Sequence, residues 1–197
     1  MHRHPLDFLN GIVLIFWLTF YAYWAVSAAG VKQDVPGKGS RRGWILSRLG
    51  LVVLLVAVYR LPIFSPFWEF AASLSFFRYE AVRIVGTLLT VLGIAFAVWA
   101  RGYLGRNWSP RPTMKIGHEL ITSGPYSFVR HPIYTGILVG LFGTGLVIGP
   151  VWMALFVVFL LIFVWRIRVE EVYMMELFPD EYPAYRARTK ALIPAVW

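Results

Sequence analysis

The chain has 197 residues, of which 58% are hydrophobic and 15% are charged, and its mean hydropathy is +0.64. Soluble domains carry about 25% charged residues, so the composition indicates a membrane protein. The net charge of +9 does not favour nucleic acid as a partner, because the basic residues lie between apolar runs and suit anionic lipid headgroups. The sequence contains no cysteine, which excludes disulfides, thiolate metal sites and cysteine nucleophiles.

Three apolar segments in the first half of the chain are predicted to span the membrane. The first, residues 8–29, is about long enough to span and lacks a convincing signal-peptide cleavage site. The second covers residues 44–59, with Arg48 placed to snorkel near its end. The segment 61–77 is rich in aromatic residues and contains proline, so it is expected at the interface. The third span is predicted over residues 84–100.

The longest uncharged run, residues 131–165, is too long for one span. As a single helix its 35 residues would extend about 52 Å, whereas the hydrocarbon core is about 30 Å thick. Gly149 and Pro150 lie near its middle, and proline breaks a helix interior. The run therefore predicts a tight hairpin of two spans, residues 133–148 and 151–165.

The distribution of lysine and arginine predicts the orientation. Residues 30–48, residues 101–131 and the segment after residue 165 carry five Lys or Arg each, and the remaining connections carry four. With five spans the three rich regions fall on one face, which the positive-inside rule makes cytoplasmic. The predicted fold is all-α: a polytopic integral membrane protein with about five transmembrane helices, its N-terminus outside and its C-terminus cytoplasmic.

A polar segment, "SGPYSFVRHPIYTG" (residues 123–136), directly precedes the hairpin. His131 stands before a proline and is biased toward extended backbone, while Pro132 suits the first position of a helix. The unpaired N–H groups and the dipole of that helix start would attract an anion. Three further side chains are expected to converge there: Tyr126, Arg130 and Tyr134. The alternative is that these residues only anchor a helix at the interface.

A second cluster lies where the last span is expected to continue into the cytoplasm, in "WRIRVEEVYMMELF" (residues 165–178). Arg166 and Glu170 are four residues apart and share one helix face. At the membrane surface such charges usually face a cavity or each other, although a solvated ion pair is an equal alternative. The other charged residues of this helix are expected to be solvated: Arg168, Glu171 and Glu176.

These motifs carry a family resemblance. "HELITSGPYSFVRHPIYTG" (residues 118–136) followed by "RIRVEEVYMMELFPDEYPAYRARTKALIP" (residues 166–194) resembles the isoprenylcysteine carboxyl methyltransferase family, to which phospholipid N-methyltransferases are related. The resemblance implies a catalytic half over residues 101–197, with a cofactor loop, the helical hairpin and a cytoplasmic C-terminal helix. Residues 1–100 would form the first three spans and the interfacial segment.

The resemblance also implies a cofactor, S-adenosylmethionine, with S-adenosylhomocysteine as product, bound in a cytoplasm-facing pocket. Arg166 corresponds to the substrate-facing arginine of the family, and Arg166 and Glu170 are the predicted catalytic residues. The cofactor contacts carried over are His118, Glu119, Leu120, Ile121, Tyr126, Arg130, His131, Pro132, Ile133, Tyr134 and Glu170. No metal site is predicted.

The chemistry of the acceptor is only partly indicated. A sulfonium donor is already activated, so placing an acceptor in line supplies most of the catalysis. Arg166 could hold a carboxylate without deprotonating it, whereas an amine would need a base such as Glu170. We therefore expect O-methylation of a lipophilic or prenylated acceptor, with membrane lipids as partners and the oligomeric state open. The alternatives are a phospholipid N-methyltransferase, an NADPH-dependent sterol-type reductase and a non-enzymatic lipid-binding protein.

Overall fold

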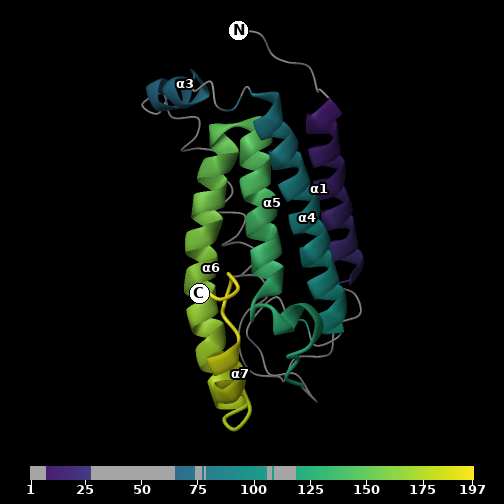
Figure 1. The fold of residues 1–197 in the computed structure, drawn as a ribbon, viewed down its shortest axis with the longest axis vertical. Helices are drawn as coiled ribbons and strands as arrows, with labels where there is room; N and C mark the ends of the chain where they lie inside the picture. Colours follow the sequence, from purple (N-terminus) through teal and green to yellow (C-terminus); the bar gives the residue numbers. More distant parts are fainter. Residues whose placement is uncertain (1–7, 28–64, 74–76, 78, 106–107, 109–118) are drawn as a thin grey trace.

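The computed structural model describes residues 8–27, 65–73, 77, 79–105, 108 and 119–197 (Figure 1). Its helices, in chain order, are α1 (Phe8–Ser27), α3 (Ser65–Ser73), α4 (Glu80–Leu104), the 3-10 helix η4 (Gly124–Ser127), α5 (Pro132–Ile148), α6 (Pro150–Leu177) and α7 (Tyr182–Arg188). Within these ranges the chain forms no strand, and one isolated parallel bridge joins Val129 and Lys190. The all-α prediction is confirmed for this part of the chain.

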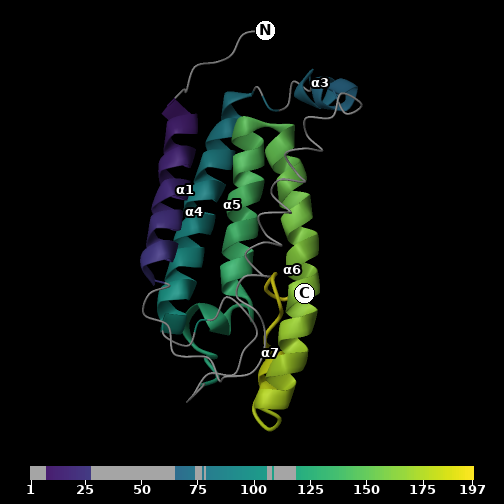
Figure 2. The same ribbon diagram turned by 180° about the vertical axis from the view of Figure 1, so that it is seen from behind.

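Four long helices lie side by side in an elongated bundle (Figures 1 and 2). Helices α1, α4 and α6 run in one direction and α5 runs in the opposite direction. The short helix α3 lies at the end of the bundle where α4 begins, whereas η4 and α7 lie at the other end. The polar segments on either side of the hairpin are therefore gathered at one end of the molecule.

Three described helices are long and apolar enough to cross a membrane: α1 with 20 residues, α4 with 25 and α6 with 28. The apolar helix α5 has 17 residues and falls just short of that length. The predicted second span, residues 44–59, lies outside the described residues, and α3 covers part of the predicted interfacial segment. A helical membrane protein is confirmed, while the count of five spans and the orientation remain predictions.

The predicted hairpin is confirmed at the expected residues. Helix α5 ends at Ile148 and α6 begins at Pro150, with Gly149 between them at φ 121°, a conformation that favours glycine. Pro150 occupies the first turn of α6, where its missing N–H costs nothing. The 28 residues of α6 extend about 42 Å, so the helix continues beyond a hydrocarbon core of about 30 Å.

Helices α4 and α5 pack with their backbones almost in contact. A Cβ atom added to Gly93 would lie 2.5 Å from the backbone N of Gly140 and 2.6 Å from the O of Gly136. Close approach through small residues is the usual basis of helix association in membranes. Gly143 lies against Gly86 in the same interface, so it too allows the close approach of α4 and α5.

Replacement of Gly93 by alanine should therefore force α4 and α5 apart. We expect a loss of about 1–3 kcal/mol in the free energy of unfolding, because the clash is with backbone that cannot rotate away. Thermal unfolding in detergent measures it. Gly11→Ala in α1 is the matched control, because a Cβ at Gly11 meets nothing within 4 Å. Equal stability of the two variants would contradict the packing described here.

A buried polar contact fixes α1 against this pair. The indole Nε1 of Trp17 donates to Thr144 Oγ1 at 2.9 Å, and Thr144 Oγ1 lies 3.3 Å from Thr90 Oγ1. Each threonine also donates to a carbonyl one turn earlier in its own helix, Gly86 for Thr90 and Gly140 for Thr144. Hydrogen bonds between helices in an apolar surrounding specify which faces meet. The three helices form one framework on which the polar end of the bundle is carried.

Candidate functional site

The N-terminus of α5 has the local structure that the sequence predicts. His131 is the residue before the helix, with φ −123° and ψ 60°, and Pro132 takes the first helical position. The preceding backbone is tied to the end of the chain: the N–H of Arg130 donates to Lys190 O at 2.8 Å and that of His131 donates to Ala191 O at 3.0 Å. The start of α5 is thus held by a segment sixty residues later in the sequence.

Glu170 on α6 meets the first turn of α5. Its Oε1 accepts a hydrogen bond of 2.6 Å from the Tyr134 hydroxyl and one of 2.8 Å from Arg166 Nη2. Its Oε2 lies 3.7 Å from Nδ1 of His131. The two predicted clusters therefore form one polar site. We call these four residues, His131, Tyr134, Arg166 and Glu170, the polar site.

Aromatic rings set the geometry of the polar site. The ring of Tyr134 stacks on that of His131 with centroids 5.6 Å apart and on that of Phe163 at 4.3 Å. The guanidinium of Arg166 lies over the Tyr134 ring, 5.6 Å from its centroid, within the range of a cation–π interaction. Tyr134 is therefore packed between two rings and aligned toward Glu170.

The prediction that Glu171 is solvated is wrong. Glu171 is 7% exposed, and its Oε1 accepts hydrogen bonds from both Nε and Nη2 of Arg130. Its Oε2 lies 3.2 Å from Arg186 Nε, and its Oε1 lies 3.4 Å from His131 Nε2. Arg168 and Glu176 are exposed, as expected. We call Arg130, Glu171 and Arg186 the clamp, because they join the start of α5, α6 and α7.

The spacing along α6 explains why Glu171 is buried. The buried residues of this helix are Phe163, Ile167 and Glu171, at intervals of four, which defines one continuous inward face. The same interval of four, continued one turn beyond Phe163 and Ile167 in the sequence, identifies Glu171 as a residue of the inward face. Glu170 lies beside this face and keeps 20% of its side-chain surface exposed.

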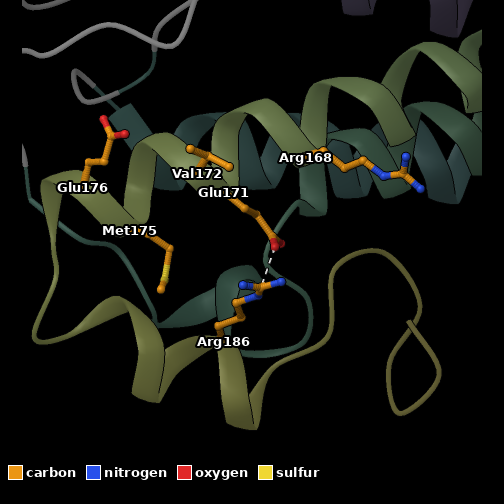
Figure 3. A pocket seen from close by; sticks show the side chains of 6 residues that line it. All are labelled: Arg168, Glu171, Val172, Met175, Glu176 and Arg186. Carbon is orange, nitrogen blue, oxygen red and sulfur yellow. Dashed lines mark ion pairs between the residues drawn. The ribbon is translucent and has the colours of Figure 1, made fainter.

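A hollow of about 450 Å³ opens beside the clamp (Figure 3). It is lined by Arg168, Glu171, Val172, Met175, Glu176 and Arg186. Figure 3 shows Glu171 and Arg186 pointing toward each other from α6 and α7, while Glu176 points away from them. None of the residues predicted to contact a cofactor lines this hollow. It belongs to the junction of α6 and α7 rather than to the polar site.

Arg130 is engaged within the protein. Besides its two bonds to Glu171, its Nη1 donates to Thr189 O and, at 3.3 Å, to Arg186 O. Its charge is therefore matched by a buried carboxylate and by carbonyl oxygens. A direct contact between Arg130 and a cofactor remains a prediction, and the structure shows Arg130 holding the segment that fixes the start of α5.

Tyr126 is a packing residue of the loop before α5. It is 7% exposed, its hydroxyl donates to Ala100 O at 3.4 Å, and its carbonyl accepts from the Tyr185 hydroxyl at 2.7 Å. Burial, with a smaller contribution from Tyr185, raises the pKa of Tyr126 well above the ordinary range for tyrosine. The Tyr126 phenol is therefore neutral at physiological pH and joins η4 to α4 and α7.

The remaining residues predicted to contact the cofactor differ in how far they are buried. His118 lies outside the described residues, Glu119 is exposed, and Leu120 is half-buried. Ile121 packs against a buried cluster that includes Tyr126 and Ile133. Pro132 and Ile133 are buried, so at the polar site their backbone, rather than their side chains, would be available to a ligand.

These features define a class: an integral membrane helical bundle with a charged and aromatic site where two neighbouring helices meet at one end. The sequence model of the phospholipid methyltransferase family matches residues 81–181, which include α4, the polar site and the clamp carboxylate. The chain belongs to this family.

Individual proteins of known name or structure agree with the assignment. The Saccharomyces cerevisiae protein-S-isoprenylcysteine O-methyltransferase is 33% identical over 117 residues, which cover 57% of this chain and 49% of that one. The cobalt-zinc-cadmium resistance protein CzcN of Cupriavidus metallidurans is 34% identical over 121 residues, covering 59% and 54%. The chain thus spans about half the length of these curated relatives.

The fold is also that of a solved structure. The eukaryotic intramembrane Ras methyltransferase, isoprenylcysteine carboxyl methyltransferase, superposes with a TM-score of 0.64 at 19% identity, over 98% of this chain and 69% of that chain. At this level of identity the match shows the fold alone. It supports the arrangement of the helices in the bundle.

Proposed function

We propose that this protein is an integral membrane methyltransferase that uses S-adenosylmethionine and methylates the carboxylate of a lipophilic acceptor, of which isoprenylcysteine is the leading candidate. The observation that carries the proposal is the meeting of Glu170 with Tyr134 and Arg166 at the start of α5. The family assignment and the relative named as an isoprenylcysteine O-methyltransferase support it. They favour a methyltransferase over the reductase and the lipid-binding alternatives.

The residues of the polar site fit the cofactor. The first N–H groups of α5 have no partner within the helix and suit its carboxylate. The carboxylate of Glu170, still 20% exposed, suits its ammonium group. Within the described residues the buried Nε2 of His131 makes no hydrogen bond, although it lies 3.4 Å from Oε1 of Glu171. When bound, S-adenosylmethionine supplies an activated methyl group on a positively charged sulfonium.

The geometry favours a carboxylate acceptor over an amine. Oε1 of Glu170 already accepts hydrogen bonds from Tyr134 and from Arg166, so this oxygen orders its neighbours and is poorly placed to remove a proton. Arg166 keeps 18% of its side-chain surface exposed, so its guanidinium is within reach of an anion. A carboxylate held by arginine needs no base before it accepts a methyl group. Glu170 then serves to orient Arg166.

We further propose that the polar site faces the cytoplasm. Helices α1, α4 and α6 all end at the side where the polar site lies (Figure 1). The arginines that follow Trp165, Arg166 and Arg168, lie at that side and favour the cytoplasmic face under the positive-inside rule. Under this proposal the N-terminus of α1 lies outside and the end of α6 lies inside. A lipophilic acceptor would then approach within the cytoplasmic leaflet.

Methyl transfer tests the proposal directly. Purified protein in phosphatidylcholine vesicles is given S-adenosylmethionine with a labelled methyl group and either N-acetyl-S-farnesylcysteine or phosphatidylethanolamine. We expect label in the farnesylcysteine as a base-labile methyl ester, because Arg166 can hold its carboxylate. Farnesylcysteine amide, which lacks the carboxylate, is the matched control acceptor.

The outcomes separate the alternatives. Label in phosphatidylethanolamine alone would replace carboxyl methylation by amine N-methylation and would give Glu170 the role of a base. If neither acceptor is labelled but the protein still binds S-adenosylhomocysteine, the proposed cofactor site stands and the proposed class of acceptor is overturned. Absence of both binding and transfer would overturn the proposed function.

A further inference from the structure

The last segment of the structure, Thr189–Trp197, turns back along the bundle. We call it the return segment. It lies between α5 and α6 in both views of the molecule (Figures 1 and 2). The N–H of His131 donates to Ala191 O at 3.0 Å, and the hydroxyl of Thr135 donates to Leu192 O at 2.8 Å. The return segment is therefore fixed against the first turns of α5.

Its buried residues show how far it reaches. Ala191 and Leu192 are each 4% exposed and belong to one cluster with Leu138, Phe163 and Ile167. The first charged residue of α6 is Arg166. Phe163 lies three residues before it and is therefore about 4.5 Å closer to the middle of the span. The return segment therefore lies level with the apolar part of α6 and not only with its charged end.

Four backbone N–H groups of the return segment are paired within the segment itself. The N–H groups of Leu192 and Ile193 donate to Trp197 O at 2.7 and 2.8 Å, and those of Val196 and Trp197 donate to Ile193 O at 3.1 Å. Pro194 has no N–H to satisfy. Irregular backbone is tolerated at membrane depth only where its polar groups find partners inside the protein. The N–H groups of Leu192, Ile193, Val196 and Trp197 meet that requirement.

The outward surface of the same turn is apolar. Ile193 is 54% exposed, Val196 is 70% exposed and Trp197 is 44% exposed, and residues 191–197 include no charged side chain. The outward residues of neighbouring α6 at this level are also apolar, Leu161 at 65% and Trp165 at 66% exposed. The exposed surface of the return segment is therefore apolar, as is the exposed surface of α6 at this level.

We infer that the return segment is a re-entrant membrane contact: after leaving the bilayer through α6 and α7, the chain re-enters it, and Ile193, Val196 and Trp197 contact lipid acyl chains and the interface. Tryptophan at this position suits the boundary between hydrocarbon and headgroups. The inference rests on α6 as a membrane span and does not depend on the proposed activity.

A single spin label tests the inference, because the chain has no native cysteine. Val196→Cys carries a nitroxide, and the protein is reconstituted in phosphatidylcholine vesicles. Collision rates with oxygen, which concentrates in the bilayer, and with a water-soluble nickel chelate are measured by power saturation. We expect the ratio of oxygen to nickel accessibility at Val196 to match that of a label at Leu161→Cys on α6.

Ala187→Cys on the exposed side of α7 is the aqueous control, and its ratio should be several-fold lower than that at Val196. A nickel-accessible label at Val196, equal to that at Ala187, would overturn the inference. Because Val196 is 70% exposed, the substitution leaves the buried cluster intact, and the thermal unfolding of the labelled protein checks this. A second label at Ile193→Cys must give the same answer as Val196.

Discussion

Replacement of Glu170 by glutamine should abolish high-affinity binding of S-adenosylhomocysteine while leaving the protein folded. Glutamine preserves the size of the side chain and can still accept a hydrogen bond from Tyr134, but it removes the charge that orders Arg166 and attracts the ligand's ammonium group. Hydrogen bonds to charged groups contribute about 1.5–3 kcal/mol each, so affinity should fall about 10- to 100-fold. Isothermal titration calorimetry in detergent measures it.

The matched control is Glu176→Gln, which removes the same charge from the same helix at an exposed position. Its affinity should equal that of the unmodified protein. Tyr134→Phe provides an intermediate case: it keeps the stacking on His131 and Phe163 and removes the hydroxyl that donates the 2.6 Å hydrogen bond to Glu170. If Glu170→Gln and Glu176→Gln bind the ligand equally well, the polar site is not the cofactor site.

Local sequence rules predicted the parts of the site that depend on near neighbours. The pair Gly149–Pro150 ends one helix and begins the next for reasons of backbone geometry alone. Pro132 likewise fixes where α5 begins, and the four-residue spacing of Arg166 and Glu170 places them on one face. Their convergence with Tyr134 follows because a tight hairpin makes α5 and α6 antiparallel neighbours.

The parts that sequence reasoning missed depend on contacts between distant segments. Glu171 was expected in solvent because a glutamate at the end of a helix is usually exposed. Its burial depends on Arg130 and Arg186, which lie 41 residues before it and 15 residues after it, and no local pattern pairs these residues. The packing of Ala191 and Leu192 against Leu138, Phe163 and Ile167 likewise follows from no local pattern, because these partners come together only in the folded hairpin.

Arg130→Ala should destabilise the protein strongly, because it breaks the buried pair with Glu171. The side chains of Arg130 and Glu171 are each 9% exposed, so the variant leaves a buried carboxylate without its main partner. Breaking a buried ion pair by removing one member typically costs about 3–5 kcal/mol. The exposed Arg186, at 53%, compensates little, because solvent screens its interaction with Glu171.

A second substitution distinguishes loss of charge balance from loss of packing. In the Arg130→Ala background, Glu171→Gln should recover part of the lost stability, because the uncompensated buried charge is removed. Arg168→Ala, on the same turn of α6 but exposed, should leave the unfolding temperature in detergent unchanged. Recovery by Glu171→Gln would show that Arg130 acts by matching the charge of Glu171. No recovery, or an Arg130→Ala variant as stable as Arg168→Ala, would mean that the clamp does not hold α5, α6 and α7 together.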